Sequence, residues 1–141
     1  MKIAIKKLDK DAKIPAYSHP GDAGMDLFSL GDFSIKPGER LACPTGISIA
    51  IPKVYAGLIW DKSGIASKSG IKTMAGVIDS GYRGEIKIVL INLSPDVYNI
   101  KKGDKIAQML IQKVENPEII EMEELDETIR GEGGFGSTGN H

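Results

Sequence analysis

Asp79 and Tyr82 lie three residues apart in the segment AGVIDSGYRGE, which runs from Ala75 to Glu85. A carboxylate can take a proton from water that attacks an electrophile, and a tyrosine ring offers an aromatic platform beside it. Asp79 also stands between glycines on a predicted hairpin, where an aspartate commonly bonds to its local backbone. Alone, the segment fits both a general base and an ordinary turn residue.

A second group of residues has the composition of an anion-binding site. The segment DKSGIASKSG, residues 61–70, offers a lysine, a hydroxyl and a glycine backbone at the start of a possible short helix. Gln108 stands in the apolar run KGDKIAQML, and Asp26 in AGMDLFS could serve a turn or support a metal. Taken singly, these features also fit a helix cap, a satisfied amide and a turn carboxylate.

The segment RGEGGFGSTG, residues 130–139, has five glycines, one aromatic residue, two hydroxyl residues and one cation. Such a segment loses much conformational entropy when it is ordered and has little to pack. We expect a mobile C-terminal arm from about residue 127 to residue 141, able to order around a ligand.

Short β-strands are the elements that must position these residues. Apolar residues alternate in KIAIKKL, DFSIKPGERL, GISIAIP, GEIKIVLIN and YNIKKGDKIAQMLIQKV, with Gly or Pro between the runs. This pattern predicts one all-β domain over residues 1–141, a sandwich or barrel. SGIASKSG predicts a helix of one or two turns, and PEIIEMEELDET is acidic and ambiguous.

The composition excludes several function classes. The net charge of -1 and the pI near 6.1 give no basic footprint for nucleic acid. No apolar run approaches the roughly 20 residues of a membrane helix, and the N-terminus lacks a secretory signal. The single cysteine, Cys43, fits a buried position in a reducing compartment, so we expect a cytoplasmic protein that contacts neither membrane nor nucleic acid.

Taken together and in order, the segments AGMDLFS, DKSGIASKSG, AGVIDSGYRGEIKIVLIN, KGDKIAQML and RGEGGFGSTG closely resemble the five motifs of the trimeric dUTPase family. The resemblance covers the chain from about Ala23 to Gly139. It implies a distorted jelly-roll-like β-barrel, a homotrimer with active sites shared between subunits, and Mg²⁺-dependent hydrolysis of dUTP to dUMP and pyrophosphate. Such an enzyme limits uracil in DNA and supplies dUMP for thymidylate synthesis.

The resemblance also implies a role for each matching residue. Asp79 would activate the attacking water, Tyr82 would lie under the deoxyribose, and Asp26 would support Mg²⁺ through water. The segment from Thr73 to Asp79 would read the uracil edge with backbone groups, and Phe135 of the arm would stack on the base. The implied substrate-binding residues are Lys62, Ser63, Gly64, Thr73, Gly76, Val77, Ile78, Tyr82, Lys87, Gln108, Arg130, Phe135, Gly136, Ser137 and Thr138.

The chain departs from the family pattern at two places. Asp61 and Lys62 stand where the family usually has Pro-Arg, so we expect weaker phosphate clamping, and an Asp61 carboxylate that repels the ligand unless it points away. Gly81 stands where the family commonly has a second aspartate.

Three alternatives follow. The related dCTP deaminases need a glutamate where this chain has Val89, with Glu85 expected to be a solvated strand end, and they lack the arm. A regulatory binding protein would need an insertion between motifs, which the short connections do not offer. An inactive trimer is disfavoured by the intact Asp79, Tyr82, Gln108 and Phe135.

Overall fold

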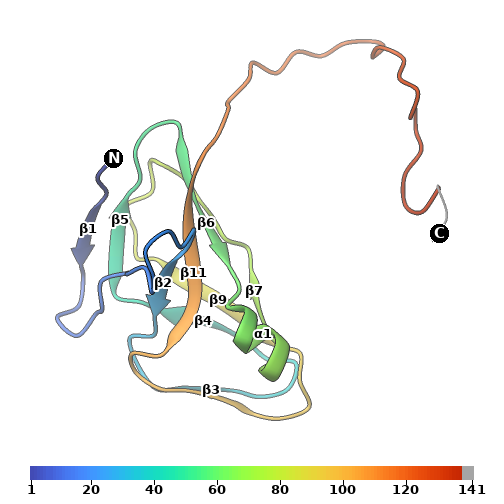
Figure 1. Cartoon of the computed structure of the whole chain (residues 1–141). Helices are drawn as coiled ribbons and strands as arrows, with labels where there is room; N and C mark the ends of the chain where they lie inside the picture. Colours follow the sequence, from blue (N-terminus) through green and yellow to red (C-terminus); the bar gives the residue numbers. More distant parts are fainter. Residues whose placement is uncertain (138–141) are drawn as a thin grey trace.

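The computed structural model describes residues 1–137, and within them the chain forms eleven strands and one short helix (Figure 1). The predicted all-β class is confirmed, and the helix falls where SGIASKSG predicted it. The elements are β1 Ala4–Lys7, β2 Met25–Phe28, β3 Phe33–Ile35, β4 Arg40–Pro44, β5 Ile47–Ala50, β6 Tyr55–Trp60, α1 Ser63–Ser69, β7 Ile71–Met74, β8 Val77–Ile78, β9 Lys87–Asn92, β10 Tyr98–Ile100 and β11 Lys105–Lys113.

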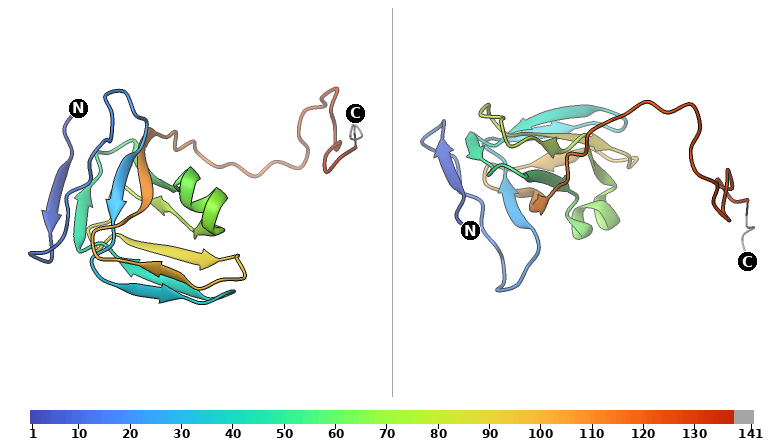
Figure 2. Two further views of the ribbon diagram at one scale, coloured as in Figure 1. Left: turned by 60° about the horizontal axis from the view of Figure 1, so that its bottom comes forward. Right: turned by 90° about the horizontal axis from the view of Figure 1, so that it is seen from above.

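The strands form antiparallel sheets that enclose one core, as in a jelly roll (Figures 1 and 2). One sheet has the order β2-β11-β6-β8, a second has the order β4-β9-β7, and β1-β5 and β10-β3 form two further pairs. Neighbours in a sheet are mostly distant in sequence, so β11 lies between β2 and β6. This arrangement brings together residues from motifs that are far apart in the chain.

Period-2 alternation produces the core. Ile86, Ile88 and Leu90 are each at most 1% exposed, whereas Lys87 between them points to solvent. A side chain of this size contributes roughly 1.5–3 kcal/mol when it is fully buried, so the inward face of each strand fixes its register. Cys43 is also buried, as predicted, and burial raises the pKa of its thiol, which makes it an unreactive core residue.

Two turns form where Pro37-Gly38 and Lys102-Gly103-Asp104 predicted them, and each joins strands of different sheets. The Lys36 carbonyl accepts from the Glu39 N–H at the Pro37-Gly38 turn. The Lys101 carbonyl accepts from the Asp104 N–H at the second turn, but β10 pairs with β3 while β11 pairs with β2 and β6. The two strands therefore do not form a hairpin.

The segment between β7 and β8 is also not a closed hairpin. β7 pairs with β9 and β8 pairs with β6, so the chain crosses from one sheet to the other at Ala75 and Gly76. Both residues have positive φ, 59° and 123° respectively. A Cβ at Gly76 would lie 3.0 Å from the Ile59 carbonyl oxygen, so glycine permits this close approach. The predicted hairpin is in fact a corner between sheets.

The chain leaves the body after β11 (Figures 1 and 2). The last backbone hydrogen bond to the body runs from the Val114 N–H to the Val54 carbonyl. From there to residue 137 the chain has no helix or strand, so PEIIEMEELDET forms neither within the described part. The departing segment thus begins about a dozen residues before the arm boundary that the glycines suggested.

Candidate active site

Asp79 and Tyr82 line one hollow of about 230 Å³ on the surface of the body. The Asp79 carbonyl accepts from the Tyr82 N–H at 3.1 Å, which closes a tight turn and brings the two side chains to the same place. The Asp79 side chain is exposed, and no hydrogen bond from residues 1–137 occupies its carboxylate. The carboxylate is therefore free to accept a proton. The full lining is Val77, Ile78, Asp79, Tyr82, Glu85 and Lys87.

The Tyr82 ring is held by local contacts. Its hydroxyl donates to the Glu85 carbonyl at 2.9 Å, and a Cβ at Gly84 would collide with the ring. Glycine at position 84 is therefore what allows the ring to lie across the backbone. Gly81 meets no other atom in this way, so an aspartate there would have room.

Glu85 differs from the sequence expectation. It was expected as a solvated strand end, but its carboxylate accepts from the Gly46 N–H at 3.0 Å and its side chain is only 24% exposed. β9 begins two residues later, at Lys87, so Glu85 belongs to the loop and is anchored to the turn before β5. Glu85 fixes the wall of the hollow.

The corner from Thr73 to Asp79 divides into two parts. Val77 and Ile78 face the Asp79 hollow, and Val77 is 69% exposed. The Gly76 carbonyl accepts from the Ile59 N–H at 2.8 Å, and the Thr73 N–H and hydroxyl both donate to Asp61. These groups of Thr73 and Gly76 are thus already bonded within the chain.

Gln108 lies at the centre of a second group of predicted residues. It stands on β11 opposite Asp26 of β2 and Trp60 of β6. Its amide donates to the Asp61 carbonyl at 2.9 Å, and a Cβ at Gly24 would collide with the amide oxygen. Gln108 is therefore fixed at the point where the Lys62 segment begins.

Asp26 and Lys62 form a buried ion pair. The Lys62 ammonium lies 2.6 Å from one oxygen of Asp26, whose side chain is 3% exposed. Lys105 lies 2.6 Å from the other oxygen, which also accepts from the Ser18 hydroxyl. Burial alone would raise the pKa of Asp26, but hydrogen bonds from Lys105, Lys62 and Ser18 lower it to about 2.

These contacts bear on the expected metal role of Asp26. Both carboxylate oxygens already face ammonium groups, which a cation would have to displace. Residues 1–137 contain no cluster of three or more His, Cys, Asp or Glu side chains that could hold a metal ion. The arrangement does not fit a protein-built metal site at Asp26.

Ser63 and Gly64 begin α1 with their backbone exposed. The first helical hydrogen bond runs from the Ala66 N–H to the Lys62 carbonyl, so the N–H groups of Ser63 and Gly64 have no partner within the helix. The Lys62 side chain does not cap the helix. Two donors and a hydroxyl therefore face outward beside Lys62.

Asp61 points away from these donors. Its Oδ1 accepts from the Thr73 N–H at 2.6 Å and from the Thr73 hydroxyl at 2.7 Å, and its Oδ2 lies 2.8 Å from the Lys72 ammonium. Burial would raise the pKa of Asp61, but the bonds from Lys72 and Thr73 lower it. The Asp61 carboxylate is bonded to β7 and points away from the donors of Ser63 and Gly64. In this arrangement it does not repel an anion bound at those donors.

The two groups lie at opposite ends of β6. Ile78 pairs with Gly57, and continuing that register places Asp79 beside Ala56. Gln108 of the second group pairs with Trp60, four residues further along β6, which corresponds to about 13 Å at the rise of a β-strand. One chain thus separates its Asp79 hollow from its Lys62 and Gln108 group.

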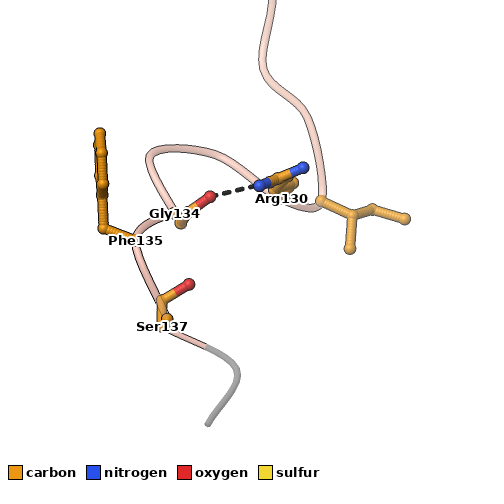
Figure 3. Close-up of a pocket in the computed structure, with 7 residues that line it drawn as sticks. Arg130, Gly134, Phe135 and Ser137 are labelled. Carbon is orange, nitrogen blue, oxygen red and sulfur yellow. Dashed lines mark hydrogen bonds between the residues drawn. The ribbon is translucent and has the colours of Figure 1, made fainter. Parts of the chain in front are cut away.

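The predicted arm residues lie away from both groups (Figure 1). The arm curls on itself around a hollow lined by residues between Ile129 and Ser137, with the Arg130 Nε donating to the Gly133 carbonyl at 2.8 Å. Figure 3 shows Phe135 and Arg130 extending to different sides of this loop, and Phe135 is fully exposed. Thr138 lies outside the described residues.

Several residues of the second group were not singled out from the sequence. Lys105 and Ser18 bond Asp26, and Gly24 makes room for Gln108. Gly24 lies in AGMDLFS and Lys105 in KGDKIAQML, so both residues belong to motifs that the sequence had already identified. Ser18 precedes its motif and is brought in only by the fold.

Comparison with known proteins gives a consistent result. The profile of the dUTPase family matches residues 10–139. The chain is 50% identical to the deoxyuridine 5'-triphosphate nucleotidohydrolase of Rhodococcus erythropolis, over 100% of this chain and 88% of that protein. The structure is similar to that of the Staphylococcus bacteriophage 80alpha dUTPase with dUPNHPP, with a TM-score of 0.92 at 31% identity over 98% of each chain. It is also similar to a mutant dUTPase from phage phi11 of S. aureus, described for its coordination of a structural Mg(II) ion, with a TM-score of 0.85 at 27% identity over 90% of this chain and 100% of that one.

Proposed function

Because this chain belongs to the dUTPase family, we propose that it hydrolyses dUTP to dUMP and pyrophosphate with Asp79 as the base that activates water. The observation that carries the proposal is the Asp79 hollow, where a free carboxylate stands beside an anchored tyrosine ring. As a dUTP diphosphatase, it would limit uracil incorporation into DNA and supply dUMP for dTMP synthesis.

The chemistry assigned to Asp79 is proton removal. A water molecule attacks the α-phosphorus, its proton passes to the Asp79 carboxylate, and the bond from that phosphorus to the bridging oxygen breaks to release pyrophosphate. The carboxylate is exposed and unbonded within the described residues, so it needs no rearrangement to accept the proton.

Substrate selection would come from the walls of this hollow. Tyr82, held by the Glu85 carbonyl, would lie under the deoxyribose and leave no space for a 2′-hydroxyl. Backbone groups of Val77 and Ile78 would meet the uracil edge from the side of β8 that does not pair with β6, since β8 is the edge strand of its sheet and lines the hollow. Lys87 at the start of β9 completes the wall.

The phosphates would bind at the second group of residues. The N–H groups of Ser63 and Gly64 and the Ser63 hydroxyl follow directly after Lys62, and Gln108 is bonded to the Asp61 carbonyl beside them. This group lies at the opposite end of β6 from Asp79 of the same chain, which favours a site built from more than one copy. We therefore expect the catalytic site to form between copies of the chain, in a homotrimer.

The arm would close the site. It carries an exposed aromatic ring and a cation and makes no backbone bond to the body after Val114 within the described residues. Phe135 would stack on uracil, while Arg130, Gly136, Ser137 and Thr138 would cover the phosphates. Ordering over the nucleotide would exclude water from the reaction.

The divalent metal would enter with the substrate. Mg²⁺ keeps several waters and binds mainly to substrate phosphates in sites of this kind, where it screens charge and orients the triphosphate. Asp26 is engaged by two lysines, so the described residues offer the metal no dedicated cage.

A product assay tests the proposal. The protein would be incubated with Mg²⁺ and, separately, dUTP, dCTP, dTTP or UTP, and the products would be separated by chromatography. We expect dUMP and pyrophosphate from dUTP alone. Conversion of dCTP would favour the deaminase relatives, and dUTP binding without turnover would favour a regulatory protein.

The variant Asp79→Asn tests the role of the base. We expect kcat to fall by roughly 10²–10⁴-fold with dUTP affinity nearly unchanged, since asparagine fits the hollow but cannot take the proton. Asp96→Asn, which changes another exposed carboxylate, is the matched control. Substantial residual turnover in Asp79→Asn would exclude Asp79 as the base.

A further inference from the structure

Lys105 stands beside the proposed phosphate site, although neither the mechanism nor the motif comparison gives it a role. Its ammonium lies 2.6 Å from the Oδ2 of Asp26 and 2.6 Å from the Ser18 hydroxyl. Lys62 takes the other oxygen, Oδ1, at the same distance. Each oxygen of one buried carboxylate is thus held by a different lysine.

A bulge in β11 brings Lys105 to this position. Gln108 pairs with Asp26 and Lys105 pairs with Phe28. Lys105 and Gln108 are three positions apart on β11, whereas Phe28 and Asp26 are only two positions apart on β2. The register shifts between Lys105 and Ala107, so one extra residue is accommodated there. Without the bulge, residues 105 and 108 would face opposite sides of the strand.

Lys105 keeps the buried Asp26 carboxylate paired when Lys62 moves. The Asp26 side chain is 3% exposed, and a buried charge that loses its only partner is strongly destabilised. If Lys62 were that only partner, it could not turn toward a phosphate without leaving a bare carboxylate next to an anionic substrate. A second lysine on the other oxygen removes this obstacle.

The two lysines also differ in freedom to move. Lys62 has one acceptor, Asp26 Oδ1, and stands next to the exposed N–H groups of Ser63 and Gly64. Lys105 is held by both Asp26 and Ser18. More of the Lys105 side chain is exposed, 46% against 28% for Lys62, but Lys105 has two acceptors to leave and Lys62 has one. By its contacts Lys62 is therefore the lysine that can transfer, and Lys105 the one that stays.

We infer that Lys105 is a positioning residue that keeps Asp26 neutralised, so that Lys62 can transfer from Asp26 to the phosphates of the bound nucleotide. The inference rests on the proposed function, because it takes the triphosphate as the ligand of Lys62. It also gives Asp26 a purpose other than metal binding: the carboxylate holds Lys62 in place until substrate arrives.

The test compares steady-state kinetics of Lys105→Gln with those of Lys36→Gln, which removes the same charge at an exposed position. We expect Lys105→Gln to raise the KM for dUTP about 10-fold with kcat within 2-fold of the parent, because only Lys62 then neutralises Asp26. Lys105→Arg should restore the KM. A KM equal to that of Lys36→Gln would overturn the inference.

The Asp26→Asn background separates positioning from direct contact. Without the carboxylate there is no charge for Lys105 to neutralise, so adding Lys105→Gln should change the KM by less than 2-fold. A 10-fold effect that persists in this background would mean that Lys105 binds phosphate itself and would overturn the inference. This comparison also holds if Lys105→Gln alone folds poorly, since the double variant leaves no unpaired buried charge.

The outcome is distinguishable from failure of the proposed function. If the parent protein does not hydrolyse dUTP, the proposed function fails before any variant is compared. If it does, and Lys105→Gln lowers only the thermal midpoint while KM is unchanged, Lys105 is structural and the inference alone is wrong.

Discussion

Replacing Asp61 by alanine should cost about 3 kcal/mol of stability, because one carboxylate makes three contacts. Hydrogen bonds to a charged acceptor contribute roughly 1.5–3 kcal/mol each, and Asp61 accepts two from Thr73, which is only 7% exposed. The ion pair with Lys72 adds at most about 0.5 kcal/mol, since that lysine is half exposed. Because the two Thr73 bonds share one oxygen of Asp61, we take the lower value of roughly 1.5 kcal/mol for each bond.

Asp61→Asn should cost only about 1 kcal/mol. An asparagine keeps an oxygen that can accept from Thr73, but the bonds become neutral and weaker. Because Asp61 ties the Lys62 segment to the corner that begins at Thr73, we also expect Asp61→Ala to raise the KM for dUTP about 10-fold.

Urea denaturation checks the stability values. The chain has one tryptophan, Trp60, next to Asp61, so its fluorescence reports unfolding at the position that is changed. Protein concentration must be equal in all samples, because assembly into the proposed homotrimer would contribute to apparent stability. Asp96→Ala, which removes an exposed carboxylate, is the control.

Two results would refute the reasoning. If Asp61→Ala and Asp96→Ala have equal unfolding free energies, the Thr73 bonds contribute nothing. If Asp61→Asn instead lowers the KM and leaves stability unchanged, the carboxylate acts mainly by repelling the triphosphate.

Three further predictions concern other parts of the molecule. Truncation after Ile129 should leave the unfolding free energy within about 0.5 kcal/mol, because the buried core ends before the arm, while kcat/KM falls on the order of 100-fold or more; unchanged kinetics would show that the arm is only a tail. Gly24→Ala should displace the Gln108 amide and raise the KM for dUTP about 10-fold, with Gly31→Ala, where a Cβ would meet only the Phe33 ring at 3.4 Å, controlling for loss of a glycine away from the site. Asp26 has a folded pKa of about 2 against a usual value of 3.8, so its contribution of about 2 kcal/mol is present above pH 4 and lost as the pH falls toward 2. Urea titrations at pH 5 and pH 2.5 measure how much unfolding free energy is lost between the two pH values. This loss should be smaller for Asp26→Asn than for the parent, and equal losses would contradict the assigned pKa.

Much of the fold could be predicted because it depends on local patterns. Alternation in GEIKIVLIN places Ile86, Ile88 and Leu90 inward whatever the strand pairs with, and the structure buries all three. The departure of the C-terminal segment from the body also fits the sequence, since a glycine-rich segment with Phe135 as its one large apolar residue cannot bury enough surface to order alone. The one helix among residues 1–137 is too short to cross a membrane.

Strand pairing could not be predicted, because alternation fixes which face a residue occupies and not which strand lies beside it. The sequence predicted two strands around a turn at Lys102-Gly103-Asp104 and a hairpin before Asp79, yet in both places the chain crosses between sheets. The crossing requires long-range contacts that no local pattern contains.

By itself, the sequence determined the all-β class, the inward faces of the strands, the five ordered motifs and the glycine-rich arm. The tertiary structure decided how charges pair: Asp61 turns toward Thr73, and Asp26 holds Lys62 and Lys105 together. The bulge before Gln108 shows the physical reason. Face alternation is a property of a few neighbouring residues, whereas an ion pair between β2 and β11 depends on a register that packing of the whole body sets.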